Sequence, residues 1–91
     1  MFSLKGKNAV VTGAGSGIGK AAALLFAQQQ AMVHLLDLNQ DAIDAVANEI
    51  SNSKGSAIAH KCDVSQQKEV KNIFAGLKKI DILVTAQVFR I

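Results

Sequence analysis

A glycine-rich turn near the start of the chain is the segment best suited to chemistry. Residues 12–19 read TGAGSGIG, so four of these eight residues are glycine. Glycine lets a backbone turn sharply and approach a bound group that a side chain would keep away. The turn opens a segment of helical spacing, and a helix N-terminus offers free N–H groups and a positive dipole end to phosphates. The pattern therefore indicates a phosphate-binding turn, and the alternative is a tight turn without a ligand.

Asp37 lies at a position where a dinucleotide-binding site would need a carboxylate. Asp37 follows the apolar run at 32–36 and comes 18 residues after Gly19. At the end of a second strand, a carboxylate can accept hydrogen bonds from the adenosine ribose hydroxyls, and it would repel a 2′-phosphate. Ser16 is not basic and no arginine lies near Asp37, so the pattern favours NAD over NADP. The alternative is that Asp37 only helps to start the next helix.

Few other side chains in the chain could react. His34 and His60 fall inside predicted strands, so we expect packed or edge side chains rather than catalytic bases. Cys62 is the single cysteine. It cannot form an internal disulfide, and we expect it to be a small buried residue. The sequence has no metal-ligand spacing, so no metal site is predicted.

The elements that must position these residues alternate in type. Apolar runs predict strands at 9–12, 32–36, 56–62 and 80–84, with helical spacing between them. The order βαβαβαβ, with short connections, predicts a parallel sheet with helices on both faces, which is half of a doubly wound α/β fold. In such sheets ligands bind outside the carboxyl ends of the strands. The glycine turn, Asp37 and Asp63 all lie at those ends.

Each predicted helix has an apolar stripe. The helix at 17–30 is expected to bury four residues: Ile18, Ala21, Ala22 and Leu25. Asn39 is a plausible N-cap for the second helix, whose stripe is Ile43, Val46, Ala47 and Ile50. Ser65 can cap the third helix, whose stripe is Val70, Ile73, Phe74 and Leu77.

Three motifs at fitting intervals resemble those of the short-chain dehydrogenase/reductase family. Residues 12–19 are similar to its cofactor motif Thr-Gly-x-x-x-Gly-x-Gly. Asp63 and Val64 resemble an Asp-Val pair whose Asp contacts the adenine amino group, and residues 81–84 (DILV) resemble the stretch that leads into Asn-Asn-Ala-Gly. The resemblance covers residues 5–84. It implies the first part of a Rossmann fold and an oxidoreductase that transfers hydride between NAD and an alcohol or ketone.

The motifs and the resemblance together predict a dinucleotide site. Its residues are Gly13, Gly15, Ser16, Gly17, Ile18, Gly19, Asp37, Leu38, Asp63 and Val64. The expected cofactor is NAD, with NADP less favoured. In the family a Ser and a Tyr-x-x-x-Lys carry the proton transfer, and this chain contains no Tyr. We therefore expect no catalytic residue here and no activity from the chain alone.

The sequence departs from the family pattern after residue 84. Where Asn-Asn-Ala-Gly is expected it reads Thr85, Ala86, Gln87 and Val88, and residues 85–91 (TAQVFRI) fit no family pattern. A one-base deletion in a coding sequence for Asn-Ser-Ala-Gly-Ile-Ser-His-Ile-Gly can yield TAQVFRI followed by a stop codon. The expectation is a truncated NAD-binding Rossmann domain over residues 1–91 with a non-family tail at 85–91. A small-molecule substrate would then belong only to a full-length parent.

Two alternatives to the dehydrogenase reading stay open. The chain could be a free-standing nucleotide-binding module or a non-functional frameshifted remnant. A nucleic-acid-binding protein is disfavoured, because the net charge of +3 is mild and the basic residues are spread out. The dinucleotide is therefore the expected partner, and self-association through an exposed strand at 80–84 is a further expectation.

Composition bounds the class of protein. The chain is 49% hydrophobic and 19% charged, which is typical of a globular domain. Residues 1–8 contain no apolar run of signal-peptide length, and no stretch approaches the ~20 apolar residues of a membrane span. With one cysteine, these features favour a cytoplasmic location and no membrane partner.

Overall fold

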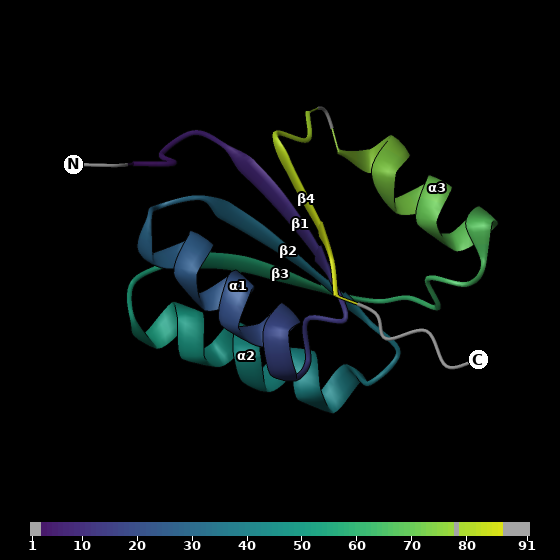
Figure 1. Cartoon of the computed structure of the whole chain (residues 1–91), viewed down its shortest axis with the longest axis horizontal. Helices are drawn as coiled ribbons and strands as arrows, with labels where there is room; N and C mark the ends of the chain where they lie inside the picture. The colour runs from purple at the N-terminus through teal and green to yellow at the C-terminus, as the bar shows by residue number, and fades with distance from the viewer. Residues whose placement is uncertain (1–2, 78, 87–91) are drawn as a thin grey trace.

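The computed structural model describes residues 3–77 and 79–86, which form one sheet and its covering helices (Figure 1). The elements are β1 (Asn8–Thr12), α1 (Gly17–Gln28), β2 (Met32–Asp37), α2 (Gln40–Asn52), β3 (Ser56–Lys61), α3 (Gln67–Gly76) and β4 (Ile82–Thr85). The strands are parallel, in the order β3-β2-β1-β4. The predicted α/β fold is confirmed. Among the described residues, no helix combines the length and the apolar character needed to cross a membrane.

The sheet separates two layers of helices. Helices α1 and α2 cover one face, and α3 lies over the other (Figure 1). Successive side chains of a strand point to opposite faces. Ala9 and Val11 of β1 therefore join the larger core cluster with α1 and α2, whereas Val10 joins the smaller cluster under α3. All three are fully buried, so β1 holds the turn that follows it between two packed layers.

Helix α2 is amphipathic in the way that its spacing predicts. Ile43, Val46 and Ile50 are buried in the larger core cluster. The Asn39 side chain accepts a hydrogen bond from the Ala42 N–H at 3.1 Å, which confirms Asn39 as the N-cap. An N-cap of this kind contributes about 1 kcal/mol because it pairs one of the unsatisfied N–H groups of the first turn.

The predicted stripe of α1 is wrong. Ile18 and Leu25 are 80% and 54% exposed, and the buried residues are Gly19, Ala23 and Ala27. The helix is apolar around most of its circumference, so spacing alone could not select the inner side. The inner side consists of small residues because α1 lies very close to the backbone of the preceding turn. A Cβ on Gly19 would collide with the Gly13 carbonyl group.

The start of α3 also differs from the prediction. Ser65 does not cap the helix, because its Oγ donates a hydrogen bond to Asp63 Oδ1 at 2.6 Å. The N-cap position belongs to Gln66, which makes no side-chain cap bond within the described part of the chain. The predicted packing stripe is confirmed nonetheless. Its four residues pack against the smaller core cluster: Val70, Ile73, Phe74 and Leu77.

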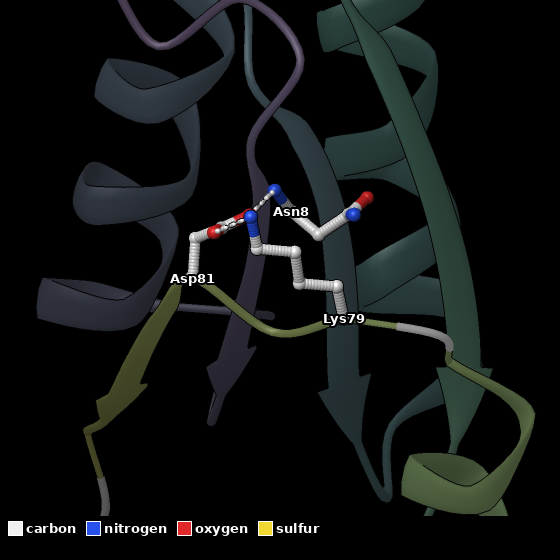
Figure 2. A network of polar contacts seen from close by, with 3 residues as sticks. All are labelled: Asn8, Lys79 and Asp81. Carbon is white, nitrogen blue, oxygen red and sulfur yellow. Dashed lines mark hydrogen bonds and ion pairs between the residues drawn. The ribbon is translucent and has the colours of Figure 1, made fainter.

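Strand β4 begins two residues later than predicted, because Asp81 is used to fasten the strand to β1. The Asp81 carboxylate accepts a hydrogen bond from the Asn8 N–H at 2.8 Å, and the Asp81 N–H donates to the Asn8 carbonyl at 2.9 Å. Lys79 Nζ lies 3.4 Å from the same carboxylate, and Figure 2 shows the three residues of this network together. These contacts set the register in which Ala9 lies beside Ile82.

Candidate functional site

The glycine turn connects β1 to α1 at the carboxyl edge of the sheet. Gly13 and Gly17 have φ angles of 66° and 57°, a region that residues with a Cβ rarely adopt. A Cβ on Gly17 would meet no packed group within 4 Å in the part of the chain that the structure describes, and Gly17 is exposed to solvent. In the described ranges Ser16 makes no side-chain bond to α1. The first N–H groups of α1 therefore remain available to an anion.

Asp37 ties the glycine turn to the next loop. Its Oδ2 accepts a hydrogen bond from the Gly15 N–H at 3.0 Å, and its Oδ1 accepts one from the Asn39 N–H at 3.1 Å. A Cβ on Gly15 would lie 2.8 Å from both the Ala42 Cβ and Asp37 Oδ2. Gly15 is therefore needed so that the turn can pack against both Asp37 and α2.

A small hollow of about 70 Å³ lies beside the turn. Its lining comes from three separate segments of the chain: Gly13, Asp37, Leu38, Cys62, Asp63 and Val64. Five of these six residues belong to the site predicted from the sequence. The structure thus brings the glycine turn, the end of β2 and the loop after β3 together at one edge of the sheet.

Asp63 is held as a carboxylate by its neighbour. Its Oδ1 accepts hydrogen bonds from the Ser65 hydroxyl and from the Ser65 N–H, the latter at 3.0 Å. These two hydrogen bonds keep the pKa of Asp63 below its ordinary value. Together with Asp37, Asp63 makes the hollow rich in hydrogen-bond acceptors, which suits a ligand with hydroxyl or amino donors.

Cys62 also lines the hollow, a position that its residue type alone did not indicate. It is 1% exposed, which confirms that it is a buried residue. Burial, with smaller contributions from the charges of Glu69 and Asp63, raises the pKa of the Cys62 thiol. A thiol of this kind stays protonated and unreactive, so Cys62 shapes the hollow without offering a nucleophile.

The remaining predicted residues fall into two groups. Ser16, Gly17 and Ile18 are exposed along the start of α1, beside the open face of the turn. Gly19 is buried under α1 and serves to let the helix approach Gly13. Ser16, Gly17 and Ile18 are therefore accessible from solvent, whereas Gly19 acts through the packing of the turn.

The chain after β4 passes against the same turn. The Ala86 N–H donates to the Thr12 carbonyl at 3.3 Å, and a Cβ on Gly13 would lie 3.2 Å from the Ala86 carbonyl oxygen. Thr85 and Ala86, the first two residues of the predicted tail, thus border the site. Residues 87–91 lie outside the described residues.

The two histidines lie away from the turn, on the α3 face of the sheet. His34 is 5% exposed and its ring stacks on that of His60, which confirms them as packed side chains. In the described ranges, no three side chains of His, Cys, Asp or Glu converge in a way that could hold a metal ion.

Comparison with known proteins identifies the family. A family model described as short chain dehydrogenase matches residues 7–87. The chain belongs to the short-chain dehydrogenase family. The predicted resemblance is thereby confirmed, and the matched segment includes Thr85 and Ala86, although their sequence departs from Asn-Asn-Ala-Gly.

Relatives of this chain are longer than it is. A 7alpha-hydroxysteroid dehydrogenase of Escherichia coli (strain K12) is 42% identical over 85 residues, which are 89% of this chain and 33% of the relative. The crystal structure of a hydroxysteroid dehydrogenase from Escherichia coli superposes with a TM-score of 0.85 at 41% identity, covering 91% of this chain and 37% of that one. The chain therefore spans about a third of the length of these relatives.

Similar structures contain both kinds of nicotinamide cofactor. A 7alpha-hydroxysteroid dehydrogenase complexed with NADH and 7-oxo glycochenodeoxycholic acid has a TM-score of 0.82 and 41% identity, covering 89% of this chain and 33% of that one. A metagenomic short-chain oxidoreductase in complex with NADP has a TM-score of 0.81 and 34% identity, covering 88% and 38%. The fold of this chain is thus one that other proteins use with NADH and with NADP.

Proposed function

We propose that this chain forms the dinucleotide-binding part of an oxidoreductase that transfers hydride between NAD and an alcohol or ketone. The bound dinucleotide would supply the hydride-transferring ring, and this chain would hold its adenosine and phosphate portions. The hollow where Gly13, Asp37 and Asp63 meet carries the proposal. It places hydrogen-bond acceptors directly beside a glycine turn and a helix N-terminus.

The residues fit a dinucleotide in a specific way. The open face of the turn at Gly17, together with Ser16 and Ile18, would receive the phosphates. Asp37 would accept from the ribose hydroxyls, and Leu38 and Val64 would flank the adenine. Asp63 would accept from the adenine amino group. The lack of side chains at Gly13, Gly15 and Gly19 would let the turn lie close enough to the dinucleotide for these contacts.

Charge at the site favours NAD over NADP. The carboxylate of Asp37 lies 3.0 Å from the Gly15 N–H, so a 2′-phosphate would sit beside a negative charge. Lys20, in the first turn of α1, lies instead 3.8 Å from Glu49 of α2. We expect NAD to bind more tightly than NADP by about tenfold, or about 1.4 kcal/mol.

Calorimetric titration of the whole chain with NAD, NADP and ADP-ribose tests this proposal. Asp37→Ala should bring the affinities for NAD and NADP together. Asp41→Ala is the matched control, because Asp41 is an exposed acid in the first turn of α2 and does not line the hollow. Equal affinity for NAD and NADP in the unchanged chain would refute the role of Asp37. Absence of binding to all three would refute the site.

A second function, a nucleotide-binding module without turnover, is favoured by two observations. The hollow gathers residues suited to adenosine, and the chain contains no Tyr to move a proton. The module would bind ADP-ribose as tightly as NAD. Hydride transfer to a ketone, assayed with NADH and this chain alone, would exclude it.

A further inference from the structure

Asp37 makes contacts that a ribose acceptor alone would not need. Its two carboxylate oxygens take backbone N–H donors from two different loops, Gly15 in the turn before α1 and Asn39 in the loop before α2. We name this pair of hydrogen bonds the Asp37 bridge. We propose that the Asp37 bridge positions the glycine turn before any dinucleotide binds. This inference rests on the proposed function, since it concerns how the same site is prepared.

The Asp37 side chain is attached to backbone that hydrogen bonds hold in place at the end of β2. The Asp37 carbonyl accepts a hydrogen bond from the Cys62 N–H at 3.0 Å, and the preceding carbonyl, of Leu36, accepts one from the Ala14 N–H at 3.3 Å. The end of β2 is thus bonded both to the loop after β3 and to the turn itself. A side chain attached here can transmit the rigidity of the sheet to Gly15.

The turn is also held from its other side. A Cβ at Gly15 would lie 2.8 Å from the Ala42 Cβ, and Ala42 is fixed in the first turn of α2 by its bond to the Asn39 side chain. Gly15 therefore lies between Asp37 and α2. Gly15 can keep both its hydrogen bond and its packing only while the end of β2 and the start of α2 stay together.

A segment with four glycines in eight residues needs such a restraint. Glycine loses more backbone entropy on ordering than any other residue, and a turn ordered only by its ligand would subtract that cost from the affinity. A hydrogen bond to a charged acceptor is stronger than a neutral one. The Asp37 bridge therefore moves the ordering cost from ligand binding to folding.

The bridge also bears on the choice of cofactor. Each carboxylate oxygen that accepts one N–H can still accept another donor, so ribose hydroxyls can bind while Gly15 stays bonded. A 2′-phosphate is an acceptor and cannot share the carboxylate in this way. Binding of NADP would therefore displace Asp37 from Gly15 and disorder the turn, in addition to the charge repulsion.

Amide hydrogen exchange by NMR on the ligand-free whole chain tests the Asp37 bridge. The Gly15 amide should be protected in the unchanged chain, and Asp37→Ala should speed its exchange by about tenfold or more. Asp37→Asn keeps a side-chain oxygen that can accept from Gly15, so it should restore part of the protection. The Ala14 amide, bonded to Leu36, should stay protected in all variants and reports that the sheet is intact.

The control is Asp41→Ala, which should leave Gly15 exchange unchanged. Equal exchange of the Gly15 amide in the unchanged chain and in Asp37→Ala, with Ala14 still protected, would overturn the proposal. Titration with ADP-ribose separates it from the proposed function. Protection that depends on Asp37 without any binding would uphold the bridge and refute the dinucleotide site. Binding with an unprotected Gly15 would refute the bridge and uphold the site.

Discussion

His34 and His60 face each other on neighbouring strands, with Nδ1 of His34 3.1 Å from Nε2 of His60. Their ring centroids are 5.3 Å apart and their planes differ by 27°. One N–H fits between these two nitrogens, so the pair forms a single hydrogen bond when one of the facing nitrogens is unprotonated. Protonation of both rings would remove that bond and place two positive charges side by side.

We therefore predict that acid destabilises the fold through this pair. Burial lowers the pKa of both histidines, and the charge of His60 lowers the pKa of His34 further. The unfolded chain binds protons near the ordinary value of 6.5 while the folded chain resists them. The contribution of this pair to stability is thus fully present above pH 6.5, and it is lost as the pH falls through the lowered pKa values of the folded chain.

Urea unfolding at a series of pH values between 7.5 and 5 measures this effect. Replacing the pair, as in His34→Gln with His60→Gln, should flatten the pH dependence in that window. Gln can keep a side-chain hydrogen bond across the strands without titrating. Identical pH dependence in the unchanged chain and the double variant would contradict the prediction.

A second prediction concerns the join between β1 and β4. The Asn8 N–H, with a smaller contribution from Lys79, keeps the pKa of Asp81 below its ordinary value of 3.8. The resulting stability is present above that value and is lost as the pH falls through the lower folded pKa. Asp81→Ala should lower the melting temperature by several degrees at neutral pH and weaken the acid sensitivity below pH 4. Asp44→Ala, an exposed acid on α2, is the control, and an equal loss in both variants would contradict the role of Asp81.

A third prediction is that the chain self-associates through β4. Leu83 of β4 and Ile58 of β3 lie in one row on the same face of the sheet, at its two opposite edges, and are 52% and 45% exposed. The β4 sequence ILVT carries no charge, whereas β3 ends in Lys61. Uncharged apolar edges recruit other chains.

Sedimentation velocity over a range of concentrations distinguishes the two edges. Leu83→Lys should shift the chain toward monomer, and Ile58→Lys should do so much less, although both substitutions add the same charge at similar exposure. A monomer at all concentrations, or an equal response to the two substitutions, would refute association through β4.

Much of the fold was predictable because several local features of the sequence indicate the same element. Helix α2 has a capping Asn39, an apolar stripe ending at Ile50 and a polar outer side, and all three agree with the structure. Helix α1 has no polar side, so its sequence does not indicate which side faces the sheet. The close approach of Gly19 to Gly13 determines that side. That approach is a tertiary contact, and hydrophobic spacing does not encode it.

The candidate site divides in the same way. The glycine turn and Asp37 were predictable because each follows a strand and their spacing matches a known arrangement. The bond between Gly15 and Asp37, the packing of Ala42 on the turn and the place of Cys62 in the hollow were not. These contacts join segments that lie far apart in the sequence, and they exist only once the sheet has formed.

The last prediction uses two glycines in opposite settings. Gly19 is buried, and a Cβ there would press on the Gly13 carbonyl, a backbone group that cannot turn aside. Gly76 is the last residue of α3, and a Cβ there would meet no neighbouring group within 4 Å among residues 3–77 and 79–86. Gly19→Ala should therefore destabilise the fold by about 1–3 kcal/mol through overpacking. Gly76→Ala should leave the free energy of unfolding unchanged or raise it by a few tenths of a kcal/mol, because Ala is the better helix former. Urea unfolding of both variants gives the two free energies.

Since displacement of Gly13 would also distort the hollow, Gly19→Ala should weaken ADP-ribose binding while Gly76→Ala leaves it unchanged. Equal stability of the two variants would show that α1 can move outward without cost, and the close approach of α1 to the turn would then be no requirement of the fold.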